Sequence, residues 1–282
     1  MSSLEQVLAN TYKNACLAEI EALKPGNVHI YADGHGMVVQ DFIRSAEASS
    51  RRIADPQLSL GQRIYQSFDA TWQAVNCNTN LGIVLLCAPL IEAAYHQQKE
   101  TLEGKVTYIL NHTTQVDAQY VFDAIELANP AGLGHSDMHD VHQPAMCTLL
   151  EAMQAAASRD TIALQYSNNF QQIFNEGLPY YRQALQRWER PAWAATALYL
   201  YWLANYPDSH ITRKYSAEVA TQVKALAQVH EAAFVQLENP KHYLPKLLEF
   251  DLDLKSQGIN PGTSADLTVA TLFLNDLKNL FN

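Results

Sequence analysis

The sequence predicts an all-α protein, a single multi-layer helical domain over residues 1–282 that is built around a central buried helix. Glycine and proline are scarce, at 11 residues each, and the alternating apolar runs between turns that mark strands are hard to find. Elsewhere apolar residues recur at every third or fourth position, which is the period of a helix face. Segments 81–94 and 193–204 are apolar almost all round, so we expect both to be helices that are covered on every side.

Proline-containing breaks divide the chain into pieces of ordinary helix length, and each break is a helix stop or a turn. In chain order the breaks are Lys24-Pro25-Gly26, Asp55-Pro56, Asn129-Pro130, Arg190-Pro191, Tyr206-Pro207, Asn239-Pro240 and Asn260-Pro261-Gly262. The clearest helical period lies near the end of the chain. One apolar face over 215–237 comprises Tyr215, Val219, Val223, Leu226, His230, Phe234 and Leu237. No repeat or Gly-, Ser- or Pro-rich linker interrupts these elements, which favours one domain.

The 19 basic and 29 acidic side chains give a net charge of −10, the opposite of the basic surplus that nucleic-acid binding needs, so we expect no nucleic-acid partner. No apolar stretch reaches the roughly 18 to 20 residues that span a bilayer, so no membrane partner is expected either. The first residues lack the basic and apolar blocks of a signal peptide. The expected compartment is the cytoplasm, where the four scattered cysteines would stay reduced.

Polar residues gather where the first helix ends. The helix over 16–23 stops at Lys24-Pro25-Gly26, with Glu19 in its last turns and Asn27 and His29 just beyond. A carboxylate, a lysine and a histidine thus meet at one helix end, where they could bind a ligand. An ordinary helix stop with solvated charges is the alternative.

Three small polar residues, Asn78, Thr79 and Asn80, directly precede the most apolar helix, and Gly82 lies in its first turn. Asn and Thr are preferred helix caps, and the free N–H groups of a first helical turn also bind anions. Capping explains one such residue but not three in a row. The segment is therefore either a cap or a ligand site.

Three histidines and two aspartates, His135, Asp137, His139, Asp140 and His142, lie within eight residues. Such a density indicates a metal site. The Glu of a catalytic HExxH zinc motif is absent, so Mg²⁺ held through Asp137 or Asp140 is favoured over zinc. The alternative is a polar loop followed by a helix that begins near residue 141.

Two segments near the end of the chain could bind a polyphosphate. Thr263 with Asp266 resembles a capping box at the start of the last helix, where Gly262 lets the backbone approach a ligand. The adjacent Arg213 and Lys214 lie where a long helix is expected to begin and could grip phosphates. An ordinary cap and a solvated helix start are the alternatives.

Taken in order, these segments resemble the triphosphoribosyl-dephospho-CoA synthase family, from about Cys16 to Phe273. The motifs that carry the resemblance are Lys24-Pro25-Gly26-Asn27-Val28-His29, Asn78-Thr79-Asn80-Leu81-Gly82, Gly132-Leu133-Gly134 through Asp140-Val141, Arg159-Asp160 with Gln165-Tyr166, Asp208-Ser209 with Arg213-Lys214, and Asn260-Pro261-Gly262-Thr263-Ser264-Ala265-Asp266-Leu267. Each motif is short, but six in the same order make a chance match improbable.

The resemblance implies an all-helical transferase that uses ATP and 3′-dephospho-CoA, expels adenine, and joins the triphosphoribosyl unit to the ribose 2′-hydroxyl of the acceptor. It also implies Mg²⁺ as the cofactor. The implied catalytic residues are Glu19, Asp140 and Asp266, and the implied metal ligands are Glu19, Asp137 and Asp140. The implied substrate-binding residues are Lys24, Gly26, Asn27, Asn78, Thr79, Gly82, Arg213, Lys214, Asn260, Gly262 and Thr263.

The sequence departs from the family members tied to citrate lyase at two motifs. Where those members read Lys-Pro-Gly-Leu-Val-Asp, this chain has Lys24-Pro25-Gly26-Asn27-Val28-His29. Those members read Asn-Thr-His-Lys-Gly where this chain has Asn80 and Leu81 in place of the basic pair. The chain resembles instead the divergent archaeal and one-carbon-metabolism branch, whose acceptor could be another cofactor precursor such as a pterin. Two other readings are a non-catalytic nucleotide-binding protein and a metal-dependent hydrolase built on the histidine cluster. Aromatic helix surface over 188–202 could bury a homodimer interface or merely belong to the core.

Overall fold

The computed structural model describes residues 3–97, 100–130, 134 and 139–281. These residues form helices and no strand, so the predicted all-α class is confirmed. The α-helices are α1 (Ser3–Glu21), α2 (Val39–Ile53), α3 (Leu60–Val75), α4 (Leu81–Tyr95), α5 (Leu102–Asn111), α6 (Gln115–Ala128), α7 (Leu149–Ala156), α8 (Thr161–Ser167), α9 (Leu178–Trp188), α10 (Pro191–Asn205), α11 (Ser209–Lys214), α12 (Ala217–Val235), α13 (Leu244–Ser256) and α14 (Gly262–Phe281). A π-helical turn (Ile173–Gly177) precedes α9, and a 3₁₀ turn (Pro240–Tyr243) precedes α13.

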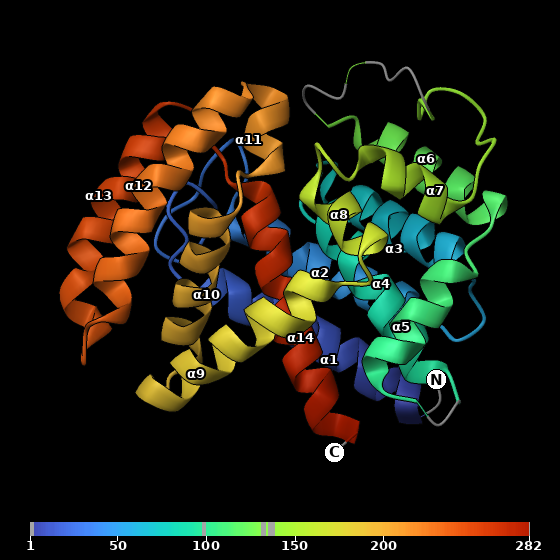
Figure 1. Cartoon of the computed structure of the whole chain (residues 1–282), viewed down its shortest axis with the longest axis horizontal. Coiled ribbons are helices and arrows are strands. Elements are labelled where there is room, and N and C mark those ends of the chain that lie inside the picture. The colour runs from blue at the N-terminus through green and yellow to red at the C-terminus, as the bar shows by residue number, and fades with distance from the viewer. Residues whose placement is uncertain (1–2, 98–99, 131–133, 135–138, 282) are drawn as a thin grey trace.

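Helix α14 occupies the middle of the molecule. In Figure 1 it runs between a group formed by α2 to α8 on one side and a group formed by α9 to α13 on the other. It packs on α1, α4 and α10. Helices α4 and α10 are buried on nearly all sides, as their uniformly apolar sequences predict. The two groups therefore meet across a centre made of α4, α10 and α14.

Buried apolar side chains from α1 to α14 form one contiguous core. Large aromatic side chains fill its centre, including Trp202 on α10, Tyr12 on α1 and Phe273 on α14. The rings of Tyr12 and Phe273 meet edge to face at 6.3 Å, a geometry that aromatic pairs prefer. Packing contacts on several sides thus hold α14 in place without a ligand at its first turn.

The face predicted for the helix over 215–237 is partly wrong. Helix α12 begins at Ala217, and Leu226 is 49% exposed. Its buried residues are Ala220, Val223, Ala227 and Phe234. The small alanines let α12 approach α10 closely, and this packing outweighs the burial of the larger Leu226. Arg213 and Lys214 accordingly end the short helix α11 instead of beginning the long one.

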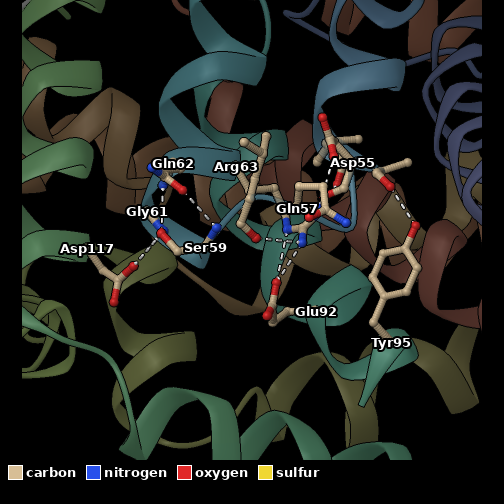
Figure 2. A network of polar contacts seen from close by, with 12 residues as sticks. Asp55, Gln57, Ser59, Gly61, Gln62, Arg63, Glu92, Tyr95 and Asp117 are labelled. Carbon is tan, nitrogen blue, oxygen red and sulfur yellow. Dashed lines mark hydrogen bonds and ion pairs between the residues drawn. The ribbon is translucent and has the colours of Figure 1, made fainter. Parts of the chain in front are cut away.

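A buried arginine fastens the junction of α2, α3 and α4 (Figure 2). The side chain of Arg63 is 1% exposed and forms an ion pair with Glu92 at 2.7 Å. Its guanidinium also donates hydrogen bonds to the carbonyls of Ile53 at 2.6 Å, Asp55 at 2.9 Å and Leu58 at 3.2 Å. The planar fork of arginine thereby satisfies the carbonyls at the end of α2 and in the turn that follows it.

The four cysteines are free, as the sequence predicts, and Cys16, Cys87 and Cys147 are buried. Burial raises the pKa of the Cys87 thiol far above its ordinary value, which keeps the thiol neutral and unreactive. Among the helices of the described residues, none is long and apolar enough to cross a membrane.

Candidate active site

A cavity of about 660 Å³ lies at the N-terminal end of α14. Residues at the N-terminal ends of α4, α8, α11 and α14 line it, together with residues of α6 and α7. The N-terminus of a helix carries partial positive charge. Side chains already accept from some N–H groups at these ends: Asn78 at α4, Asp160 at α8, and Asp208 at α11 and α14. Four such ends around one cavity favour an anionic ligand with several negative groups.

Asp266 lies in the first turns of α14 and lines the cavity. Its carboxylate lies so close to Gly82 of α4 that a Cβ atom at position 82 would be 2.0 Å from Asp266 Oδ2. Within the described residues, the carboxylate accepts no hydrogen bond. Burial raises the pKa of Asp266 well above its ordinary value, and the negative charges of Asp208, Glu19 and Asp160 raise it further. A carboxylate in this position would gain from a bound cation.

Glu19, Lys24, Asn27 and Asn260 form a chain of polar contacts behind Asp266. Lys24, which is 0% exposed, forms an ion pair with Glu19 and donates to Asn27 Oδ1 at 3.0 Å. Asn27 Nδ2 donates in turn to Asn260 Oδ1 at 2.7 Å. Burial raises the pKa of Glu19, and the charge of Lys24 opposes that rise. Glu19, Asn27 and Asn260 line the cavity, whereas Lys24 does not, so Lys24 positions the other residues.

Gly26 is structural and does not line the cavity. Its φ of 83° lies in the left-handed region, and a Cβ atom there would be 2.8 Å from Pro261 Cδ. Its N–H donates to Asp251 Oδ1 at 2.8 Å. Glycine at this position therefore lets the end of α1 pack against the turn that precedes α14.

Asn78, Thr79 and Asn80 all line the cavity, and each also forms a hydrogen bond within the protein. Asn78 Oδ1 accepts from the N–H of Leu81 at 3.2 Å and so caps α4. Thr79 donates to Ser45 at 2.6 Å, and Asn80 donates to Ser49 at 3.2 Å. The two alternatives for this segment are thus combined, because residues that secure the start of α4 also form the cavity wall.

Asp208 ties α11 to α14. Its Oδ1 accepts from the backbone N–H groups of His210 and Ile211, at 3.0 and 3.2 Å, and its Oδ2 accepts from the N–H and the hydroxyl of Ser264, both at 2.8 Å. Thr263 Oγ1 also accepts from the N–H of His210, at 3.2 Å. The predicted capping box of Thr263 with Asp266 is therefore wrong: Asp208 caps α14, which leaves the Asp266 carboxylate directed at the cavity.

His210 and Arg213 project from α11 into the cavity. The His210 ring lies over Gly262, where a Cβ atom would be 2.5 Å from His210 Nδ1. Burial and the charges of Arg213 and Lys214 lower the pKa of His210 to about 4, so the imidazole is neutral. Arg213 lies 3.6 Å from Asp160. Lys214 lies outside the cavity wall and donates to the carbonyl of Gly258 at 3.4 Å.

His210 was missed by the sequence analysis as a site residue. The available signal was its spacing, because a residue three positions before Arg213 lies on the same face of a helix.

The acidic loop before α7 contributes Asp140 and His139 to the cavity. Asp140 Oδ1 accepts from the N–H of His142 at 3.0 Å. Asp137 and His135 lie outside the described residues. The helix expected near residue 141 begins instead at Leu149, after Thr148 as its cap. In the part of the chain that is described, no group of three metal-ligating side chains is arranged to hold a metal ion.

Part of the cavity lining is apolar. Phe122 and Ile125 on α6, Leu149 and Met153 on α7, and Phe42 on α2 line it. These residues were not singled out from the sequence, because a cavity wall and a helix interface have the same period. A ligand with both a polyphosphate and an apolar or aromatic part matches this mixed lining.

A single cavity with helix N-termini, an arginine, a carboxylate and apolar side chains has the character of an enzyme site for an anionic small molecule. The sequence model of the CitG family, ATP:dephospho-CoA triphosphoribosyl transferase, matches residues 5–282, and the chain belongs to this family. The family's reaction is the ATP-dependent transfer of a triphosphoribosyl group to dephospho-CoA.

The fold is shared with a solved structure. A crystal structure from Archaeoglobus fulgidus that is assigned to triphosphoribosyl-dephospho-CoA synthase is similar to this chain, with a TM-score of 0.65 and 22% sequence identity. The match covers 83% of this chain and 97% of the archaeal one. No curated protein matches the chain.

Proposed function

We propose that this cavity binds ATP, transfers its triphosphoribosyl group to the ribose 2′-hydroxyl of dephospho-CoA, and releases adenine. The observation that carries the proposal is the Asp266 carboxylate, which faces the cavity next to the start of α4 without a hydrogen bond from any described residue. Buried polar groups are normally paired, so an unpaired one in a cavity indicates a partner that is not part of the protein.

The triphosphate lies, in this proposal, against the N-terminal turns of α4 and α14. Gly82 and Gly262 allow the close approach of other groups there, and Arg213 supplies a positive side chain. Helix ends and one arginine attract an anion even in a protein of net charge −10. The reason is that nearby dipoles and charges act more strongly on a bound anion than the distant charges of the chain, which salt screens. The adenine and pantetheine parts match the apolar wall of α6 and α7.

The chemistry requires a negative group near the ribose. As the bond to adenine breaks, the anomeric carbon gains positive charge, and a nearby carboxylate stabilises that charge. Asp266 meets this requirement, since it lines the cavity and has no competing hydrogen bond among the described residues. Glu19 is less suited because Lys24 already neutralises it.

Mg²⁺ is part of the proposal. The ion would neutralise phosphate charge, and it is commonly bound through one or two carboxylates together with substrate phosphates, so a group of three protein ligands is not needed. Asp266 and Asp140 fit this role, because both line the cavity and the pKa of Asp266 is raised by surrounding negative charge that a cation would offset.

Adenine release tests the function directly. The protein is incubated with ATP and Mg²⁺, with and without dephospho-CoA, and adenine is separated by chromatography. We expect release that needs dephospho-CoA and that is lost in Asp266→Asn. ATP-dependent thermal stabilisation without adenine would contradict transfer to this acceptor and support a nucleotide-binding protein, or an enzyme with another acceptor such as a pterin. Tightly bound zinc with phosphate release would favour the hydrolase.

We also propose that the enzyme acts in the cytoplasm on free small molecules, without nucleic acid, and as a homodimer. Exposed apolar residues on the outer helices support the dimer: Leu226 and Val229 on α12 and Leu252 on α13. Light scattering measures the mass, and a value near twice the 31.5 kDa of one chain is expected. A monomer at micromolar concentration would contradict the dimer.

A further inference from the structure

His210 is a cavity residue that no step proposed so far uses. Its ring lies over the Cα atom of Gly262 in the first turn of α14, the helix that carries Asp266. Neither ring nitrogen forms a hydrogen bond with any described residue. By contrast, its backbone N–H is held by both Asp208 and Thr263. The backbone is thus fixed while the imidazole is left available to a ligand.

The charged and titratable groups around His210 keep its ring neutral. Arg213 and Lys214 lie on the same helix, His35 precedes α2, and all three lower the pKa of His210 in addition to burial. Asp208 lies beneath the backbone of His210, and Asp266 faces the same cavity from α14. A neutral imidazole has one nitrogen that accepts a proton. The ring is therefore in the form that a general base requires.

We propose that His210 is the catalytic base that takes the proton from the hydroxyl of the acceptor. The inference rests on the proposed function and extends it by naming a residue for the proton transfer. The three carboxylates predicted from the sequence are less suited. Glu19 is paired with Lys24, Asp140 accepts a backbone hydrogen bond, and Asp266 is needed as a negative charge beside the ribose.

The proton that leaves the acceptor hydroxyl ends on adenine. The bond between the ribose anomeric carbon and adenine breaks, and its electron pair leaves with adenine. The acceptor oxygen bonds to that carbon, and its proton passes to His210. The imidazolium then gives this proton to the departing adenine, so neutral adenine leaves and His210 returns to its starting form. No further reagent is needed.

Substrate binding would strengthen His210 as a base. The triphosphate brings negative charge to Arg213, one of the cations that lower the pKa of His210. Neutralising that cation removes part of the repulsion that disfavours the imidazolium. The pKa of His210 is therefore expected to move toward its ordinary range when ATP binds, where proton transfer is more efficient.

The test compares His210→Ala and His210→Gln with a control, His112→Gln. His112 does not line the cavity and does not affect the pKa of His210, and glutamine can keep its hydrogen bond to the carbonyl of Tyr108. We expect kcat for adenine release with dephospho-CoA to fall by about 10² to 10⁴-fold in both His210 variants, with KM for ATP changed little. The control should keep the wild-type rate.

Rescue by added imidazole separates a base from a structural residue. In His210→Ala the cavity gains room, and imidazole should restore part of kcat in proportion to its neutral form, whereas His210→Gln should not respond. Wild-type kcat in both variants, or a loss confined to KM without imidazole rescue, would overturn the role of His210 and leave the transfer reaction standing. A wild-type enzyme that releases no adenine would refute the transfer reaction itself, and the role of His210 with it.

Discussion

Two regions of this protein hold charged side chains away from bulk water, and they treat them in opposite ways. At the junction of α2, α3 and α4, the Arg63 guanidinium is paired with Glu92 and donates to three carbonyls. At the start of α14, the Asp266 carboxylate has no hydrogen-bond partner among the described residues, and its pKa is raised by desolvation and by three other carboxylates. The charges of the first region are paired within the protein, whereas Asp266 in the second region needs a ligand as its partner.

This difference distinguishes residues that stabilise the fold from residues that bind a ligand, and it does so without comparison to a homologous protein. A satisfied buried network holds elements together, and breaking it lowers stability. An unsatisfied charge that is partly shielded from water lowers stability as it stands, so its presence in a cavity indicates a role in binding or catalysis. Changes in the two regions should therefore have opposite effects on stability and on activity.

Asp266→Asn should give the largest effect on activity. Removing the charge next to the ribose should lower the rate of adenine release by about 10³-fold or more, because electrostatic stabilisation is commonly the largest part of catalysis. The measurement is the initial rate with saturating ATP and dephospho-CoA. Circular dichroism should show unchanged helicity. A rate within tenfold of wild type would show that Asp266 is not the stabilising carboxylate.

The same variant should be more stable than the wild type at neutral pH. The pKa of Asp266 is raised in the folded state, so the stability that its neutral form gives is complete below the unfolded pKa of about 4 and is lost as pH rises through the raised pKa. Thermal melts from pH 4 to pH 8 should show a loss of stability in the wild type that is absent in Asp266→Asn. Parallel profiles would contradict the raised pKa.

Arg63→Met should give the reverse result. The substitution leaves three carbonyls and Glu92 without their partner and is expected to lower the free energy of unfolding by about 3 to 5 kcal/mol. Urea unfolding measures the loss. The rate of adenine release per folded molecule should stay at the wild-type value, since Arg63 lies outside the cavity. Glu92→Gln, at the more exposed end of the pair, should lose much less stability.

The sequence predicted the helical class and the buried helices α4 and α10, because an apolar segment without a polar face has to be covered on all sides. It also placed every proline-containing break at or near a helix end. It failed for α12, where packing of Ala220 and Ala227 against α10 decided which face is buried. Side-chain size across an interface cannot be read from the period of one helix.

The candidate site shows the same limit. Sequence motifs led to Glu19, Asn78, Asp140, Arg213 and Asp266, which all line one cavity although they are far apart in the chain. They also led to Lys24, Gly26 and Lys214, which do not line it. A motif cannot distinguish a residue that contacts a ligand from one that holds it in place. His210 was missed because its importance comes from contact with Gly262 across two helices.

Gly82→Ala should have an intermediate effect that tests the contact between α4 and α14. The new Cβ atom would be 2.0 Å from Asp266 Oδ2, so the carboxylate has to move. We expect a 10- to 100-fold lower rate of adenine release, on the order of 1 to 3 kcal/mol in the activation barrier, since a small misplacement of a reacting group is costly.

Gly104→Ala is the matched control for Gly82→Ala. Gly104 also lies in the first turn of a helix, α5, but the nearest atom to its Cβ position is the end of the flexible Glu100 side chain at 3.1 Å. Alanine there should raise stability by roughly 0.5 to 1 kcal/mol and leave the rate unchanged. Equal rates in both variants would mean that the contact between Gly82 and Asp266 does not matter for turnover.

The smallest effects should come from the adjacent cations, which the structure separates although the sequence joins them. Arg213 lines the cavity and Lys214 does not, since Lys214 donates to the carbonyl of Gly258 and lies over the ring of Tyr215. Arg213→Ala should raise KM for ATP about tenfold, as expected for a lost charged hydrogen bond of roughly 1.4 kcal/mol. Lys214→Ala should change KM less than about threefold, because its exposed charge acts only through water. Equal increases in both variants would mean that the triphosphate binds along the outside of α11 and not at the start of α14.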